Sequence, residues 1–314
     1  MNQKEFRPDP QYPASYREAA LRELREVLQH QEEWVKVHAA EYLLWAGYPE
    51  GVRAVYLQEE KRYGTQSPYR IGIWRVLAQV SEEEKSTWTG RIQRAFGDPD
   101  GPDRIHAAET LAKLKVPPTA APEVTRRALE SDNPALALYT RWAVAHASPE
   151  ALASTRQYLL DGLAAGPQEV LFKRLSGYIL RNLGDLTPPQ WQQLARVALA
   201  EPATSDAQVY LLSAAYVRVP AGEEASGTYA QVREKLLGTQ DSPQKAVRSE
   251  LAMALAEKGT LADLPVLLSL LTNKNPLGTA EGTWTEEALR KSPDNADVRA
   301  AAAYAILKIE QRYP

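Results

Sequence analysis

The sequence predicts an all-α protein built from stacked helix pairs. Three observations predict this class: a short motif recurs at a nearly constant spacing, its apolar residues follow the helical period, and Pro- or Gly-containing segments separate the expected helices. No segment shows the alternation of period two that marks a strand beside a hairpin turn. We therefore expect a single domain over residues 14–314, preceded by an N-terminal arm of residues 1–13.

The recurring motif is anchored on a basic residue. Lys36, Arg70 and Arg104 lie 34 residues apart, and segments 35–43 and 103–111 are the most alike. Further steps of 34, 35, 35, 40 and 51 residues lead to Leu138, Lys173, Gln208, Arg248 and Arg299. The chain is therefore expected to contain about eight units, although units 4 and 6 have no basic residue at the anchor.

Each unit is expected to contain two helices. The anchored helix places apolar or small residues four positions apart, as Val35, Ala39 and Leu43 show. A second helix precedes it in every unit. The ranges expected for these preceding helices are 16–28, 50–62, 82–96, 121–129, 149–163, 189–200, 227–237 and 261–271.

The step from the seventh unit to the eighth is too long for one helix pair. The excess lies at about residues 273–294, where we expect an insertion in the form of a surface loop. Long loops in compact domains often carry function, which makes Trp284 a candidate lid over a surface. The alternative is a packed loop whose Trp covers apolar area.

Composition restricts the class of protein. The 314 residues carry 37 Lys+Arg against 40 Asp+Glu, a net charge of −3, with 44% hydrophobic residues. Such a chain is expected to be folded and soluble, and its charge disfavours nucleic acid as a partner. No apolar run approaches about 18 residues, and no signal peptide is visible, so we expect no membrane insertion and a cytoplasmic location. The absence of cysteine excludes disulfides, thiolate metal sites and a Cys nucleophile.

The anchored motif resembles the second helix of a HEAT repeat, which has the pattern Val-Arg-x-x-Ala-Ala-x-x-Leu. It stands here at Val35-Lys36, Val247-Arg248 and Val298-Arg299. The resemblance, to the HEAT-repeat (armadillo-like) family, implies a right-handed or similar α-solenoid of about eight HEAT-like helix pairs, whose second helices line a concave face. With about 8–10 Å between packed helices, eight units make a rod or arc on the order of 70 Å long.

Basic side chains recur at the anchor position. In HEAT-like stacks this position usually forms a ladder of bonds to carbonyl and acidic groups of the neighbouring repeat. The alternative is an inner basic stripe that binds an acidic peptide, a sulfated sugar or a nucleic-acid backbone. The residues of this basic row are Lys36, Arg70, Arg104, Lys173, Arg248 and Arg299.

The anchored helices of units 1 to 3 carry the main candidate ligand site. Trp34, His38, Glu41 and Trp45 follow one stripe of the first helix. The matching positions are Gly72 and Arg75 in unit 2, and His106 and Glu109 in unit 3. An Arg between two Glu predicts an ion-pair ladder, and a Gly between two His predicts a dent that suits a small polar ligand. The alternative is a purely structural ladder.

Other chemistry has weaker support in the sequence. Arg174, Tyr178 and Tyr210 could extend the inner surface, whereas Trp74 and Trp142 are expected in the core. Glu41 and Glu109 should lie about 16–20 Å apart, too far for a pair of glycosidase carboxylates. His38 and Glu41 share a helix face, but His-x-x-Glu alone is a weak metal motif, so we expect no metal and no cofactor.

Two classes of function follow from these patterns, and a third is disfavoured. The first is a non-enzymatic scaffold that binds a protein or peptide on the concave face. The second is a binding protein or enzyme for a small polar, carbohydrate-like ligand near units 1 to 3. The third is a nucleic-acid binder like the HEAT-like DNA glycosylases, which the acidic net charge disfavours. Whether the chain is an enzyme stays open, although no P-loop, Gly-x-Ser-x-Gly or His-Glu-x-x-His motif appears.

Overall fold

The computed structural model describes residues 12–118, 121–166, 169–274 and 285–313. The structure is 75% helical, and the described residues contain no strand. The prediction of an all-α protein is therefore confirmed.

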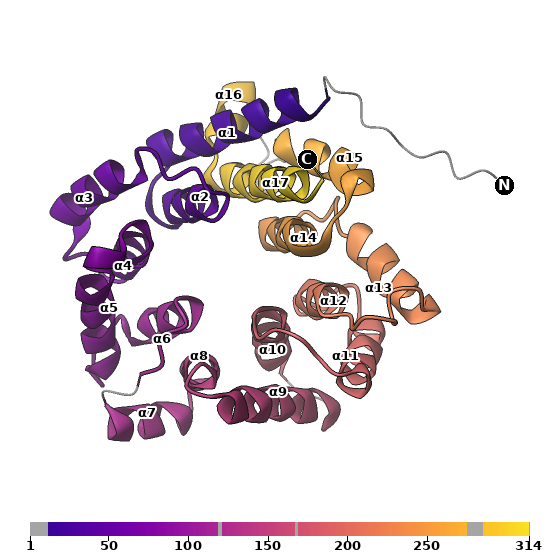
Figure 1. Cartoon of the computed structure of the whole chain (residues 1–314), viewed down its shortest axis with the longest axis horizontal. Helices are drawn as coiled ribbons and strands as arrows, with labels where there is room; N and C mark the ends of the chain where they lie inside the picture. The colour runs from indigo at the N-terminus through magenta and orange to yellow at the C-terminus, as the bar shows by residue number, and fades with distance from the viewer. Residues whose placement is uncertain (1–11, 119–120, 167–168, 275–284, 314) are drawn as a thin grey trace.

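Helices alternate between an outer and an inner layer (Figure 1). The outer helices are α1 (Tyr12–His30), α3 (Val52–Tyr63), α5 (Glu82–Gly97), α7 (Pro122–Leu129), α9 (Pro149–Ala164), α11 (Pro188–Ala200), α13 (Gly227–Leu237) and α15 (Leu264–Leu271), the last preceded by the 3-10 turn η1 (Leu261–Asp263). The inner helices are α2 (Glu33–Trp45), α4 (Tyr69–Val80), α6 (Arg104–Lys113), α8 (Pro134–Ala145), α10 (Val170–Asn182), α12 (Gln208–Val217), α14 (Lys245–Lys258) and α17 (Pro293–Arg312).

Both sets of helices lie at the predicted positions along the chain. The outer helices match the expected preceding ranges to within a few residues. Every anchor lies in an inner helix: Arg104 and Gln208 are the first residues of theirs, and the other anchors lie further along. The expected insertion is partly helical, because α16 (Glu286–Lys291) forms within it and α17 begins at Pro293. Trp284 lies outside the described residues.

Local sequence sets several helix starts. At α8 the side chain of Asn133 accepts hydrogen bonds from the backbone N–H groups of Ala135 and Leu136. At α9 the Ser148 hydroxyl accepts one from Ala151 N–H. Proline follows each of these caps, at a position where its missing N–H costs no helical hydrogen bond.

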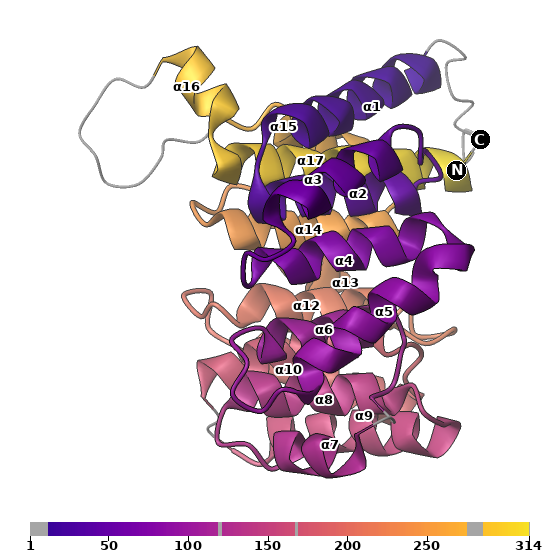
Figure 2. The same cartoon turned by 90° about the vertical axis from the view of Figure 1, so that its left-hand side faces the viewer.

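The inner helices form a closed ring (Figure 1), and from the side α2, α4, α6 and α8 lie one below another (Figure 2). Each inner helix packs against the next, and α17 then packs against α1 and α2, so the eighth unit meets the first. The structure differs here from the open rod or arc expected from the sequence. In an open arc the last helix would expose one face, whereas residues 295–307 of α17 are all buried, many of them alanines that allow close packing.

The basic row forms the ladder of structural bonds favoured by the sequence. Lys36 Nζ lies 2.8 Å from Glu59 Oε1 on the next outer helix, and Lys173 Nζ lies 2.7 Å from Glu201 Oε2. The remaining contacts are Arg70 with Asp103, Arg104 with the Val124 carbonyl, Arg248 with the Ser242 carbonyl and Arg299 with Glu23. These side chains therefore tie helices and loops together rather than form a free basic stripe.

Candidate functional site

Glu41 and Arg75 form a buried pair between α2 and α4. Arg75 Nε lies 2.7 Å from Glu41 Oε1, and Arg75 Nη2 lies 2.9 Å from Glu41 Oε2. The two side chains are only 2% and 1% exposed. Burial alone would raise the pKa of Glu41, but Arg75 and Lys113 hold it below its ordinary value. This bidentate pair supports the expected ladder between units 1 and 2.

The third member of the expected ladder takes another partner. Glu109 pairs with Lys113 one turn further along α6, at 2.9 Å, and Arg75 donates instead to the Thr110 hydroxyl at 3.3 Å. Although burial opposes ionisation, Lys113 and Arg75 lower the pKa of Glu109 to about 2. Tyr178 also donates a hydrogen bond to Glu109 Oε1 at 3.4 Å. The expected ladder therefore stops at Arg75, and Glu109 contacts Lys113 and Tyr178 instead.

The dent expected at Gly72 is filled by an aromatic ring. The Trp34 indole stacks on the His106 imidazole with 5.1 Å between ring centroids. A Cβ atom on Gly72 would lie 3.0 Å from the Trp34 ring and 2.8 Å from Val37 Cγ2. Gly72 therefore makes room for Trp34, which occupies the position expected for the dent.

His38 turns toward the end of the chain instead. Its Nδ1 lies 2.7 Å from Asp297 Oδ1 on α17. Burial alone would raise the pKa of Asp297, but His38 and Lys245 lower it. The predicted site residues of units 1 to 3 are thus divided among separate contacts. His38, Glu41 and Trp45 line the central cavity, whereas the remaining side chains do not: Trp34, Arg75, His106 and Glu109.

The central cavity lies inside the ring, between the inner helices, and has a volume of about 530 Å³. Its walls come from α2, α6, α8, α10, α12, α14 and α17, together with the segments after α6, α8 and α12. The volume falls within the range of about 300–1,000 Å³ that is usual for small-molecule sites. We call this cavity the lumen below.

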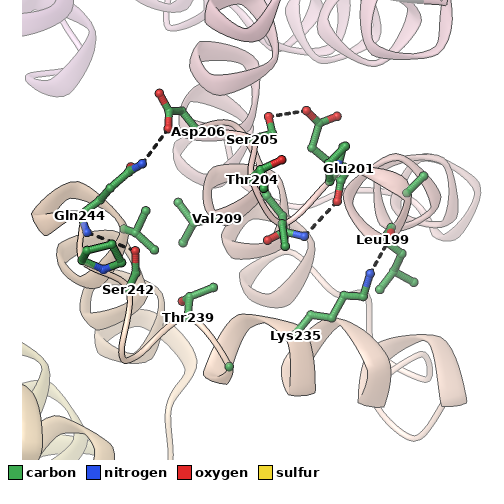
Figure 3. A pocket seen from close by; sticks show the side chains of 17 residues that line it. Leu199, Glu201, Thr204, Ser205, Asp206, Val209, Lys235, Thr239, Ser242 and Gln244 are labelled. Carbon is green, nitrogen blue, oxygen red and sulfur yellow. Dashed lines mark hydrogen bonds between the residues drawn. The ribbon is translucent and has the colours of Figure 1, made fainter.

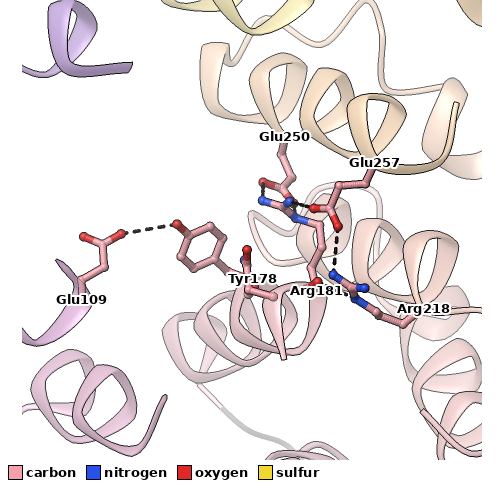
Figure 4. Close-up of polar contacts among 7 residues, drawn as sticks. Glu109, Tyr178, Arg181, Arg218, Glu250 and Glu257 are labelled. Atoms are coloured by element: carbon pink, nitrogen blue, oxygen red, sulfur yellow. Dashed lines mark hydrogen bonds and ion pairs between the residues drawn. The ribbon is translucent and has the colours of Figure 1, made fainter. Parts of the chain in front are cut away.

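Charged side chains link helices across the lumen (Figure 4). Arg181 of α10 pairs with Glu250 of α14, with 2.8 Å between Nε and Oε1, and also with Glu257. Arg218 Nη2 lies 2.9 Å from Glu257 Oε2. The Arg181 pairs connect helices two units apart, which requires the curvature of the ring, whereas Arg218, which follows α12, joins adjacent units. Burial raises the pKa of Glu250 even though Arg181 opposes the shift.

Aromatic side chains form two groups on the lumen wall. Trp142, Tyr178 and Tyr210 meet edge to face, at centroid distances of 5.6 and 6.4 Å. Tyr42 and Tyr304 stack at 5.0 Å, where α2 meets α17. Of the three secondary candidates, Tyr178 and Tyr210 line the lumen and Arg174 does not. Trp74 and Trp142 are buried, as expected, although Trp142 also borders the lumen.

The missed lumen residues had a signal in the sequence. Positions two, five and nine after the anchor are those of His38, Glu41 and Trp45 in unit 1. The same positions in the later units supply much of the lumen wall: Lys113, Tyr178, Asn182, Tyr210, Glu250, Met253, Glu257 and Tyr304. Tyr178 and Tyr210 were already candidates, and extending the stripe of the first helix to every unit would have found the others. Arg181, His146 and Lys245 lie outside these positions and carried no such signal.

A second pocket lies on the outside, between the segments that join α11 to α12 and α13 to α14 (Figure 3). Its volume is about 670 Å³. Several of its polar groups already pair with one another: Ser205 with Glu201 at 2.5 Å, Gln244 with Asp206 at 3.0 Å, and Lys235 with the Leu199 carbonyl at 2.8 Å. These pairs leave the lumen as the better candidate site.

The described residues include no group of three or more His, Asp or Glu side chains that could hold a metal ion. Among the helices of the described ranges, none is long and apolar enough to cross a membrane. Comparison of the chain with protein-family models and with characterised proteins gives no match.

Proposed function

We propose that the chain is a HEAT-like repeat protein closed into a ring, and that it binds a small polar molecule in the lumen. The lumen itself carries this proposal: a cavity of about 530 Å³ that combines charged, hydroxyl and aromatic side chains from most inner helices. The eight helix pairs at the predicted spacing support the HEAT-like assignment. No residue is assigned a catalytic step, so the proposed role is binding.

The closed ring favours a small ligand over the protein or peptide partner that the sequence favoured. That partner would lie along an open concave face over several units. Here the corresponding face is turned into the lumen, where Arg181 and Glu250 meet from helices two units apart. The same closure disfavours a nucleic acid in the lumen. The cytoplasmic location stays a prediction.

A thermal-shift screen against neutral sugars, uronic acids, nucleotides and amino acids tests the proposal. A ligand at 100 times its Kd stabilises the folded protein by about 2.7 kcal/mol, which raises the melting temperature measurably. Ala246 lines the lumen, whereas Ala230 is exposed on α13 of the outer layer. Ala246→Trp should abolish the shift, and the matched control Ala230→Trp should preserve it.

Two results would overturn the proposal. One is a ligand whose shift is the same in Ala246→Trp and in the wild type, because it would bind outside the lumen. The other is a flat screen together with a protein partner that binds wild type and Ala246→Trp equally.

A further inference from the structure

The charged side chains of the lumen are divided between two arcs of the ring. Among the described residues, all the carboxylates that line the lumen lie on α2, α14 and α17: Glu41, Glu250, Glu257 and Asp297. All the lining Lys and Arg residues except Lys245 of α14 lie on, or directly after, α6, α10 and α12: Lys113, Lys115, Arg181 and Arg218. Each set of helices is consecutive around the ring (Figure 1). An acidic arc of α14, α17 and α2 therefore faces a basic arc of α6, α8, α10 and α12.

One cation of the basic arc is available to a ligand. Four lumen cations pair with a carboxylate at 2.8–3.0 Å: Lys113, Arg181, Arg218 and Lys245. Lys115 is exposed, and within the described ranges it has no carboxylate partner. An acidic group of a ligand can therefore bind Lys115 without breaking an ion pair of the protein.

Lys115 also occupies a backbone position that favours glycine. It follows the end of α6 with φ 56°, and its N–H donates to the Ala112 carbonyl at 3.0 Å. Gly47 ends α2 in the same way, with φ 81° and a backbone hydrogen bond of 3.1 Å. A side chain is disfavoured in this left-handed conformation, so a lysine costs backbone energy that Gly47 avoids. The side chain of Lys115 is therefore not explained by the local fold.

Trp45 presents a fixed aromatic face on the acidic arc. It lines the lumen and is 38% exposed. Its Nε1–H donates to Gln79 Oε1 at 2.7 Å. Tyr42 and Tyr304 contact it edge to face, with centroid distances of 5.8 and 5.9 Å. These contacts fix the orientation of the ring before any ligand binds.

No cation of the protein uses the face of Trp45. Arg side chains lie over three other tryptophans, at 4.7–5.8 Å from the ring centroid: Trp34, Trp74 and Trp88. Trp142 and Trp191 are at most 2% exposed. Within the described part of the chain, Trp45 is thus the exposed tryptophan that no Lys or Arg covers. An ammonium group within about 6 Å of its centroid would be attracted to the ring.

From this arrangement we infer that the lumen ligand is a zwitterion, with an ammonium group over Trp45 on the acidic arc and a carboxylate at Lys115 on the basic arc. Because the two groups lie on different arcs, the ligand carries its charges several bonds apart, as ω-amino acids do. The inference rests on the proposed function and names the ligand class of the same site. It assigns no reaction to the site.

Calorimetric titration of the full chain with ω-amino acids, from γ-aminobutyrate to ε-aminohexanoate, tests the inference. Hexanoate lacks the ammonium group of ε-aminohexanoate, and hexylammonium lacks its carboxylate. We expect at least one zwitterion of the series to bind about tenfold more tightly than its singly charged analogues. Trp45→Leu should weaken that binding about threefold to tenfold. Tyr158→Leu is the matched control, because Tyr158 is 45% exposed on outer helix α9 and does not line the lumen.

Lys115→Gly separates a binding role from a structural one. Glycine suits the left-handed conformation, so the melting temperature should not fall. Affinity for the zwitterion should nevertheless drop about twofold to fivefold, because the carboxylate loses its cation. Affinity for hexylammonium, which has no carboxylate, should stay unchanged and serves as the internal control.

The outcomes separate this inference from the proposed function. If only sugars, nucleotides or singly charged molecules bind, and Ala246→Trp abolishes their binding, the zwitterion inference is wrong and the proposed function stands. Unchanged zwitterion affinity in both Trp45→Leu and Lys115→Gly would also overturn the inference, since neither end of the ligand would lie where we place it. If nothing binds in the lumen, both proposals fail.

Discussion

Arg299 of the last helix lies 2.7 Å, Nε to Oε1, from Glu23 of the first helix. The contact repeats the one between Lys36 of α2 and Glu59 of α3, at 2.8 Å, in which an anchor residue bonds the outer helix of the next unit. At the seam of the ring the next unit after the eighth is the first. The eighth unit therefore meets the first through the same kind of contact that joins consecutive units.

Breaking the Arg299–Glu23 pair should destabilise the ring. The two side chains are 6% and 13% exposed, so Arg299→Met leaves a mostly buried carboxylate without its partner. We expect the free energy of unfolding to fall by about 3–5 kcal/mol, measured by denaturant titration. Lys85→Met removes an exposed pair with Glu82 and should cost less than about 1 kcal/mol. Equal effects of the two substitutions would show that the seam does not depend on Arg299.

The low pKa of Glu109 should make stability depend on acid pH. Its pKa lies at about 2 in the folded protein, against an ordinary value of 4.5, with burial opposed by Lys113 and Arg75. A lowered pKa contributes stability above about pH 4.5, and this contribution is lost as the pH falls toward 2. In Glu109→Gln the free energy of unfolding should therefore change less between pH 4.5 and pH 2 than in the wild type, by at most about 3 kcal/mol.

Glu123 is the control for this pH dependence. Hydrogen bonds from Arg126 and Arg127 also lower its pKa to about 2, but the site is exposed to solvent, which screens the interaction. Glu123→Gln should leave the acid slope nearly unchanged. An equal flattening in both variants would contradict the view that Glu109 gains its effect from the interior of the ring.

Adding a methyl group at Gly72 should destabilise the protein. The new Cβ would lie 2.8 Å from Val37 Cγ2 and 3.0 Å from the Trp34 ring, so the packed side chains must shift. We expect Gly72→Ala to cost about 1–3 kcal/mol in thermal or denaturant unfolding. Gly90 of α5 has no neighbour closer than 3.8 Å, so Gly90→Ala should instead stabilise by up to about 1 kcal/mol. A stabilising Gly72→Ala would show that Trp34 does not occupy this position.

A charge buried between packed helices should severely destabilise the protein. Ala40 and Ala108 are both 0% exposed and hold equivalent positions in units 1 and 3. Ala40→Asp or Ala108→Asp buries a carboxylate without a partner, and we expect a loss of at least about 4 kcal/mol, seen as unfolding or a greatly lowered Tm. Ala230→Asp on the exposed face of α13 should change the Tm little. An unchanged Tm for Ala40→Asp would contradict the packing of α2.

The candidate site was predicted in part. The stripe of His38 and Glu41 does face the lumen, but Trp34, Arg75 and His106 contact neighbouring helices within the wall. A helical stripe specifies a direction from one helix and does not specify what lies opposite. The partner of His38 is Asp297, 259 residues away, and the partner of Arg181 is Glu250, two units on. Neither pairing has a local signal.

The sequence alone determined the helix pairs, because the helical period, the breakers and the 34-residue spacing are local properties that a chain displays before it folds. The ladder of basic residues followed from the same register, since Lys36 and its equivalents reach no further than the neighbouring unit. The tertiary structure decided the closure of the ring, the seam between Arg299 and Glu23, and the lumen. These features depend on a small rotation between units, summed over eight of them, and no segment of the chain encodes that sum by itself.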